Sequence, residues 1–202
     1  MMGSPTPDRS GVTGVGQAGF VERHGLYTPE QAAAANAVAR RIRERGLRTV
    51  RLTVVDQHGH PRSKSLAPDV AIAAMSNGLD FSGAIYSLDS GNQVFVPAFA
   101  AGGGFGIDEF TGFPDIVLVP DPDSFQVLPW ADSTGWLLCD TYFSNGQPMP
   151  LDGRGLMRRM LGELGDAGYD TWPGSRSSTT SSSSPANRSR RRMPASRRRR
   201  PL

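Results

Sequence analysis

The stretch Gly106-Ile-Asp-Glu-Phe-Thr-Gly-Phe-Pro-Asp-Ile-Val-Leu-Val-Pro-Asp121 joins a glycine-rich loop to a short apolar run. The run, Ile116 to Val119, has four consecutive apolar residues, three of them β-branched. Pro114 precedes it and Pro120 follows it. Because proline cannot donate to a strand ladder, the pattern predicts a short strand that lies between these prolines and is covered on both faces.

The loop before this strand, Asp89 to Asp115, is 27 residues long and contains six glycines. Loops of this length in compact domains are usually functional or disordered, so we expect the functional site at the junction of loop and strand. Gly102 to Gly106 could instead cradle a phosphate. Phosphate-binding glycine loops lie between a strand and a helix, which the sequence does not predict here, so a flexible loop is the favoured interpretation.

Further elements are predicted on both sides of this junction. A helix over 28–46 begins with the capping box Thr28-Pro-Glu-Gln31, and Gly46 ends it. Alternating and apolar runs predict strands over 50–54, 62–66, 81–88, 125–128 and 134–143. A short helix is predicted over 68–77 and another over 152–165, whose apolar residues share one face: Leu156, Met157, Met160, Leu161 and Leu164.

These elements predict an α+β fold, in which a β-grasp-like mixed sheet packs on a helix. The predicted organisation has five parts. They are a disordered leader (1–27), an N-terminal helix (28–46), a β-grasp domain (47–150), the first helix of a truncated second domain (151–170) and a disordered Ser/Arg-rich tail (171–202).

The net charge of +3 divides unevenly along the chain. Nine of the 22 basic residues follow Asp170, and all 19 acidic residues lie at or before it, which leaves residues 1–170 with a net charge of −6. An argument for nucleic-acid binding from overall charge therefore applies to the tail alone, where it predicts non-specific contact with phosphates.

Cys139 is the single cysteine, so an internal disulfide framework is excluded and a reducing cytoplasm is the expected compartment. The first residues have no apolar core typical of a secretory signal. No apolar run approaches the roughly 20 residues that span a bilayer, so we expect no membrane partner.

The turn Asp56-Gln-His-Gly-His60 places one histidine on each side of Gly59. They could bind a metal, but no carboxylate or thiol cluster accompanies them, so plain turn residues are favoured. Arg62 and Lys64 could contact an anion, but a polar strand face is the simpler explanation.

Several stretches carry a family resemblance when they are taken in order. They are Val50 to Gly59, Arg62-Ser-Lys64, Gly112 to Pro122, Val127-Leu-Pro-Trp130, Cys139-Asp140, Asn145 to Pro148, and the helix with Arg154. Together they resemble the N-terminal part of the glutamine synthetase family, over about residues 30–170. Phe113-Pro-Asp115 and Thr134-Gly-Trp136 look most similar to the branch that joins glutamate to amines other than ammonia.

The resemblance implies a cytoplasmic ATP-dependent ligase of nitrogen metabolism and glutamine biosynthesis that uses Mg or Mn. Glutamate is phosphorylated on its side-chain carboxylate, and ammonia or another amine then displaces the phosphate. It also implies a homo-oligomeric ring, in which this domain meets the catalytic domain of a neighbouring full-length subunit. For the fragment alone we expect no cofactor and no catalysis, since the metal-binding glutamates and the ATP site belong to the catalytic domain.

In the family, the N-terminal domain lends a loop carboxylate that helps to bind the ammonium or amine. Asp108 is the best positional match. The family's usual Asp-Gly-Ser-Ser motif is absent, and Asp108-Glu-Phe-Thr111 stands in its place. Glu109 could therefore bind the ammonium or amine instead. Two solvated loop acids without a function are the alternative. The identity of the amine and the ring size stay open.

After Asp170 the family would continue with a Gly-x-Glu-x-Glu strand, but this chain has Ser- and Arg-rich low complexity. A freely chosen set of codons for residues 171–185, read in another frame, gives that pattern, so a frameshift is our hypothesis for the tail. Two rival functions remain: a β-grasp binding module with an arginine-rich polyanion-binding tail, and a regulatory partner that inserts into full-length synthetase rings.

Overall fold

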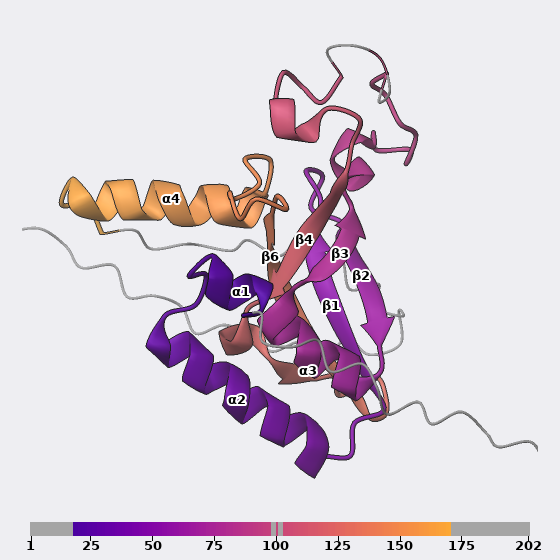
Figure 1. The fold of residues 1–202 in the computed structure, drawn as a ribbon, viewed down its shortest axis with the longest axis vertical. Helices are drawn as coiled ribbons and strands as arrows, with labels where there is room; N and C mark the ends of the chain where they lie inside the picture. Colours follow the sequence, from indigo (N-terminus) through magenta and orange to yellow (C-terminus); the bar gives the residue numbers. More distant parts are fainter. Residues whose placement is uncertain (1–17, 98–99, 101–102, 171–202) are drawn as a thin grey trace, which may run out of the picture.

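The computed structural model describes residues 18–97, 100 and 103–170 (Figure 1). Its helices are α1 (Phe20–Arg23), α2 (Pro29–Glu44), α3 (Pro68–Asn77) and α4 (Gly153–Asp166), with short 3-10 helices η1 (Gly83–Ser87), η2 (Asp108–Phe110) and η3 (Pro122–Ser124). Its strands are β1 (Thr49–Val55), β2 (Pro61–Leu66), β3 (Leu79–Ser82), β4 (Asp115–Pro120), β5 (Gln126–Val127) and β6 (Thr134–Tyr142).

The strands form one mixed sheet in the order β2-β1-β6-β4-β3, and the short β5 also pairs with β6. β1 and β6 run parallel, with Leu52 opposite Leu137, whereas every other pair is antiparallel. The predicted α+β class with a mixed sheet is confirmed. Since β6 pairs with both β1 and β4, it is the central strand of the sheet. It connects the β1–β2 pair on one side to the β3–β4 pair on the other.

β4 is the strand predicted from the apolar run, and it is buried on both faces. Ile116 and Leu118 belong to the main core together with residues such as Val50 and Leu137. Val117 and Val119 belong to a second, smaller cluster on Phe20 and Val21. The unbroken apolar run therefore reflects two different packing surfaces, as the sequence predicted.

Helices α1, α2 and α3 gather on one side of the sheet (Figure 1). The capping box of α2 is present, because Gln31 N donates to Thr28 Oγ1 at 3.2 Å and Thr28 N donates to Gln31 Oε1 at 3.0 Å. The predicted leader needs a correction here, since α1 lies within residues 1–27 and buries Phe20 and Val21. This helix is too short to show periodicity, and its order comes from packing on β4. The rest of that leader, residues 1–17, lies outside the described residues.

The strand predicted over 81–88 is wrong after Ser82. The chain leaves the sheet at Gly83 and forms η1, which begins with the Ser82 side chain accepting from Ala84 N. A Cβ on Gly83 would come within 2.4 Å of the Pro114 carbonyl oxygen and 2.6 Å of the Phe110 ring. A side chain at position 83 would therefore collide with Pro114 and Phe110, a close packing of distant residues that a local apolar pattern cannot reveal.

α4 follows the end of β6 and projects from the rest of the molecule (Figure 1). The predicted apolar residues do share this helix, but none of its residues is buried. Leu156, Met157 and Met160 are 44–53% exposed. No helix among the described residues is long and apolar enough to cross a membrane. The predicted tail, with its hypothesised frameshift, lies outside those residues.

Candidate functional site

The junction of loop and strand places two carboxylates at the surface. Asp108 and Glu109 open η2, at the top of the molecule in Figure 1, and both are exposed. Phe110, the next residue, is 0% exposed. The two acids are therefore held at the surface by a buried neighbour, in a position from which a second molecule can reach them. Their predicted role stays a prediction.

The buried anchor of these acids is an aromatic cluster. The Phe110 ring packs edge-on against Phe113 at 4.6 Å between centroids and against Tyr86 at 6.5 Å, and it lies 6.2 Å from Phe143. Gly104 closes over it with a φ of +89°, and a Cβ there would lie 2.6 Å from the Phe110 carbonyl carbon. Since no side chain fits at Gly104, the loop runs tightly over the cluster.

Two exposed aromatic rings lie close together at this end of the molecule, an arrangement that was not predicted from the sequence. Phe95 is 56% exposed and Phe105 is 41% exposed, with 6.0 Å between their ring centroids. Phe105 has a φ of 61°, which is uncommon for a residue with a bulky side chain. A phenylalanine between two glycines was the available signal, but a loop without regular structure does not show which of the nearby rings it will contact.

The hairpin end between β1 and β2 docks onto the start of the same loop. Asp56 has a fully buried side chain that accepts hydrogen bonds from His58 N, His60 N and Arg62 Nε at 2.9–3.0 Å. Burial alone would raise the pKa of Asp56, but these hydrogen bonds and the Arg62 charge outweigh it and lower the pKa. Arg62 also donates to Asn92 Oδ1.

The two histidines have structural partners within the protein. His58 Nε2 lies 2.9 Å from the Leu88 carbonyl oxygen, to which Gln57 Nε2 also donates, and His60 Nδ1 lies 3.8 Å from Asp56 Oδ2. No group of three or more metal-ligating side chains occurs anywhere in the part of the chain that the structure describes. These residues do not form a divalent-metal site, so a family metal would need ligands from elsewhere.

Lys64 also has internal contacts. Its ammonium donates to the Asp80 carbonyl oxygen at 2.6 Å and lies 5.3 Å from the centroid of the Phe81 ring. Arg62 and Lys64 are thus engaged with the protein itself, and the alternative of an anion site on this strand gains no support.

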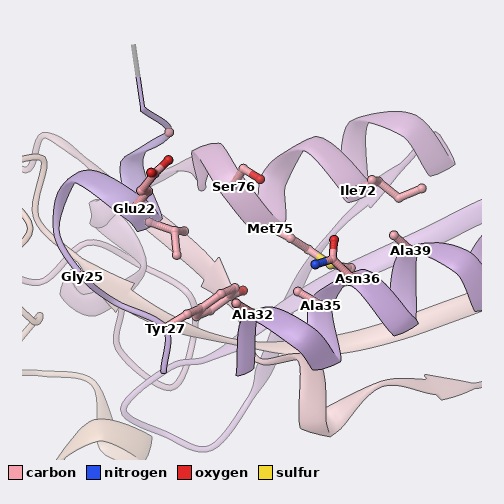
Figure 2. Close-up of a pocket in the computed structure, with 12 residues that line it drawn as sticks. Glu22, Gly25, Tyr27, Ala32, Ala35, Asn36, Ala39, Ile72, Met75 and Ser76 are labelled. Carbon is pink, nitrogen blue, oxygen red and sulfur yellow. The ribbon is translucent and has the colours of Figure 1, made fainter. Parts of the chain in front are cut away.

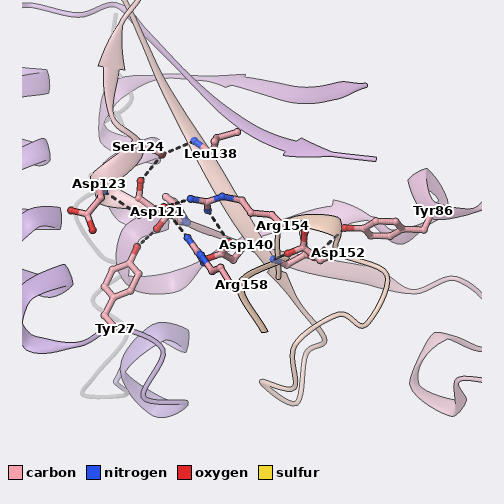
Figure 3. A network of polar contacts seen from close by, with 12 residues as sticks. Tyr27, Tyr86, Asp121, Asp123, Ser124, Leu138, Asp140, Asp152, Arg154 and Arg158 are labelled. Atoms are coloured by element: carbon pink, nitrogen blue, oxygen red, sulfur yellow. Dashed lines mark hydrogen bonds and ion pairs between the residues drawn. The ribbon is translucent and has the colours of Figure 1, made fainter. Parts of the chain in front are cut away.

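A network of charges fixes the start of α4 to the sheet (Figure 3). Arg154 and Arg158 each pair with both Asp121 and Asp140, for example Arg154 Nη1 to Asp140 Oδ1 at 2.8 Å and Arg158 Nη2 to Asp121 Oδ2 at 3.0 Å. Asp152 caps the helix by accepting from Arg154 N at 3.0 Å, and burial raises its pKa. The two carboxylates neutralise the charges of the two guanidinium groups. The network therefore has a structural role.

A pocket of about 440 Å³ opens between α1, α2 and α3 (Figure 2). Ala32, Ala35 and Met75 contribute apolar walls, and Glu22, Asn36 and Ser76 are exposed polar residues of its lining. The sequence did not predict it, because three separate helices form it. The three helices that line it lie on one side of the sheet, away from η2 (Figure 1).

Comparisons with known proteins agree with the resemblance. No family model matches the chain. γ-Glutamylanilide synthase from Acinetobacter sp is 42% identical over 153 residues, which cover 74% of this chain and 31% of the relative. Glutamine synthetase from Mycolicibacterium smegmatis (strain ATCC 700084 / mc(2)155) is 32% identical over 137 residues, which cover 65% of this chain and 26% of the relative. The matched part of this chain belongs to the glutamine synthetase family.

A third relative, glutamate–isopropylamine ligase from Pseudomonas sp, is 29% identical over 135 residues, which cover 63% of this chain and 27% of that relative. Among solved structures, one described as a GmaS/ADP complex, conformation 1, matches with a TM-score of 0.49 and 28% identity, over 64% of this chain and 25% of that chain. The chain thus spans about a third or less of the length of the relatives it matches.

Proposed function

We propose that this domain forms one side of the amine site of an ATP-dependent ligase that joins the γ-carboxylate of glutamate to an amine. The observation that carries the proposal is the 42% identity to a γ-glutamylanilide synthase. Two further relatives, a glutamine synthetase and a glutamate–isopropylamine ligase, support the same bond type with different amines. The exposed pair Asp108 and Glu109 is the part of this chain suited to contact an amine.

In the proposed reaction, ATP phosphorylates the γ-carboxylate of glutamate in the catalytic domain. The amine nitrogen then forms a bond to the γ-carbon, the carbon–oxygen bond to phosphate breaks, and inorganic phosphate leaves. The nitrogen must lose one proton for the amide to form. A carboxylate from this chain can hold the amine through its N–H groups and accept that proton.

The rest of the site would come from a catalytic domain like that of the longer relatives, in a homo-oligomer or together with full-length subunits. The resemblance assigns the ATP site and the Mg or Mn ligands to that domain. We therefore expect the purified 202-residue chain to show no ATP-dependent γ-glutamyl transfer by itself.

A hybrid enzyme tests the proposal. Residues 18–170 would replace the aligned segment of the Acinetobacter relative, and γ-glutamyl amide formation would be measured with ATP and each amine. We expect an active hybrid, in which substituting whichever of the two acids holds the amine, by Asp108→Asn or Glu109→Gln, lowers kcat/KM for the amine by about 10²–10⁴-fold. Asp80→Asn, at another exposed acid, is the matched control.

Two results would contradict the proposal. An assembled hybrid without γ-glutamyl transfer would show that this domain does not serve such a ligase. An active hybrid that tolerates Asp108→Asn and Glu109→Gln together would show that neither carboxylate contacts the amine.

A further inference from the structure

A continuous series of aromatic rings leads from the core to the surface beside the proposed amine site. Tyr86 and Phe110 are buried at its inner end. Phe105 stacks on Phe110 with 6.2 Å between centroids and an angle of 20° between the ring planes, and it meets Phe113 edge-on at 5.7 Å. Phe95 lies at the outer end, 6.0 Å from Phe105. The outer two rings, Phe95 and Phe105, are called the aromatic wall below.

The wall is held in place although it is exposed. Phe105 lies between Gly104 and Gly106, and all three have positive φ values, of 89°, 61° and 75°. Residues with large side chains adopt this conformation only where the surrounding structure enforces it, and such residues are concentrated at functional sites. Phe95 N donates to the Ser87 carbonyl oxygen at 3.0 Å, which fixes the other half of the wall.

Asp108 and Glu109 follow Phe105 by three and four residues, and Phe110, on which the wall stacks, belongs to the same short helix as these acids. An aromatic surface and two carboxylates thus share one small region. A ring on a ligand would gain contact area and favourable edge or offset stacking on the wall. An N–H group on that ring would have a carboxylate to donate to.

We propose that the aromatic wall selects aromatic amines as the acceptor substrate of the ligase, a proposal that rests on the proposed function. The aryl ring packs on Phe95 and Phe105, while the amino group donates to Asp108 or Glu109. Ammonia has no surface for the wall to contact. A small branched alkyl amine covers less of it and cannot stack, so the wall favours amines with a ring.

Binding to the purified 202-residue chain tests this inference separately from catalysis. Amide chemical shifts would be followed by NMR during titration with aniline, isopropylamine and ammonium. We expect aniline to shift the amides at Phe95, Phe105 and residues 108–109 in a saturable manner. Isopropylamine should bind at least about tenfold more weakly, and ammonium should leave the amides at Phe95 and Phe105 unchanged.

Variants locate the contact. Phe95→Ala and Phe105→Gly should each weaken aniline binding by about tenfold, while the remaining amide spectrum stays unchanged and reports an intact fold. Trp130→Ala is the matched control, since Trp130 is an aromatic residue that is 77% exposed and lies in the β5–β6 connection. This control should bind aniline as the unaltered chain does.

The inference is overturned by any of three results: no shift with aniline up to its solubility limit, equal binding of aniline and isopropylamine, or unchanged aniline binding in both wall variants. None of these bears on whether the hybrid enzyme makes γ-glutamyl amides. An inactive hybrid would in turn contradict the proposed function without changing the binding result, so the two failures can be told apart.

Discussion

Asp56 is the residue that organises the hairpin end, and its chemistry makes a pH prediction. Its side chain is buried and accepts three hydrogen bonds, and its pKa is lowered in the folded chain because these outweigh the effect of burial. A group whose folded pKa lies below its unfolded value stabilises the fold above the unfolded pKa, about 3.9 for Asp, and loses that contribution as the pH falls through the folded pKa.

Asp56→Asn should therefore lower the free energy of unfolding at pH 7 by about 1–3 kcal/mol. The difference from the unaltered chain should shrink as the pH falls below about 4. Urea unfolding at a series of pH values measures both. Asp170→Asn, at an exposed acid, is the control and should change little. A difference that stays constant down to pH 2 would mean that the Asp56 charge has no part in stability.

For single residues, the sequence was sufficient to interpret some side chains, but it did not predict which side chains contact each other. The turn interpretation of His58 and His60 could be reached because no thiol or carboxylate cluster accompanied them. Asp108 is exposed, as both its proposed role and the alternative of a solvated loop acid require. Phe105 was missed, because its significance depends on rings at positions 95, 110 and 113 that approach it only in the folded chain.

Among the elements, α4 depends on charge more than on packing. None of its residues is buried, and its start is held by Arg154 and Arg158 on Asp121 and Asp140. Because Arg154 is 24% and Asp121 only 7% exposed, these pairs are shielded more than ordinary surface ion pairs. The helix should therefore detach locally, before the sheet unfolds, when the network is weakened.

Arg154→Met should speed amide hydrogen exchange across residues 153–166 by about tenfold, with little change in β1 or β6. Arg159→Met is the matched control, since Arg159 lies in the same helix and forms no ion pair with the described residues. Hydrogen exchange read by mass spectrometry makes the comparison. Equal exchange in the two variants would contradict an ionic attachment of α4.

Local signals predicted elements well where one stretch of chain is sufficient to determine them. The capping box of α2 and the doubly buried β4 are both confirmed. The parallel pairing of β1 with β6 could not be read locally, because it joins strands separated by about 80 residues. The end of β3 at Ser82 was also misplaced, and the close packing of the next residue, Gly83, on Pro114 and Phe110 could not be read locally either.

On the scale of the whole molecule, the proposal is that this domain is complete only beside a partner. The chain spans 26–31% of the length of the relatives reported above. Its proposed site has an aromatic wall and two acids on one open end, and the exposed apolar residues of α4 lie on another part of the surface (Figure 1). We propose that a neighbouring catalytic domain closes the site, through a heterologous contact of the kind that forms rings.

Mixing two inactive hybrid enzymes tests this central claim most directly. One carries Asp108→Asn and Glu109→Gln, and the other carries an inactivating substitution in the relative's catalytic domain. If each site combines the loop of one subunit with the catalytic domain of the next, co-assembly at equal amounts should restore about a quarter of the activity of the unaltered hybrid. Activity that stays at the level of the separate variants in demonstrably mixed oligomers would contradict the claim.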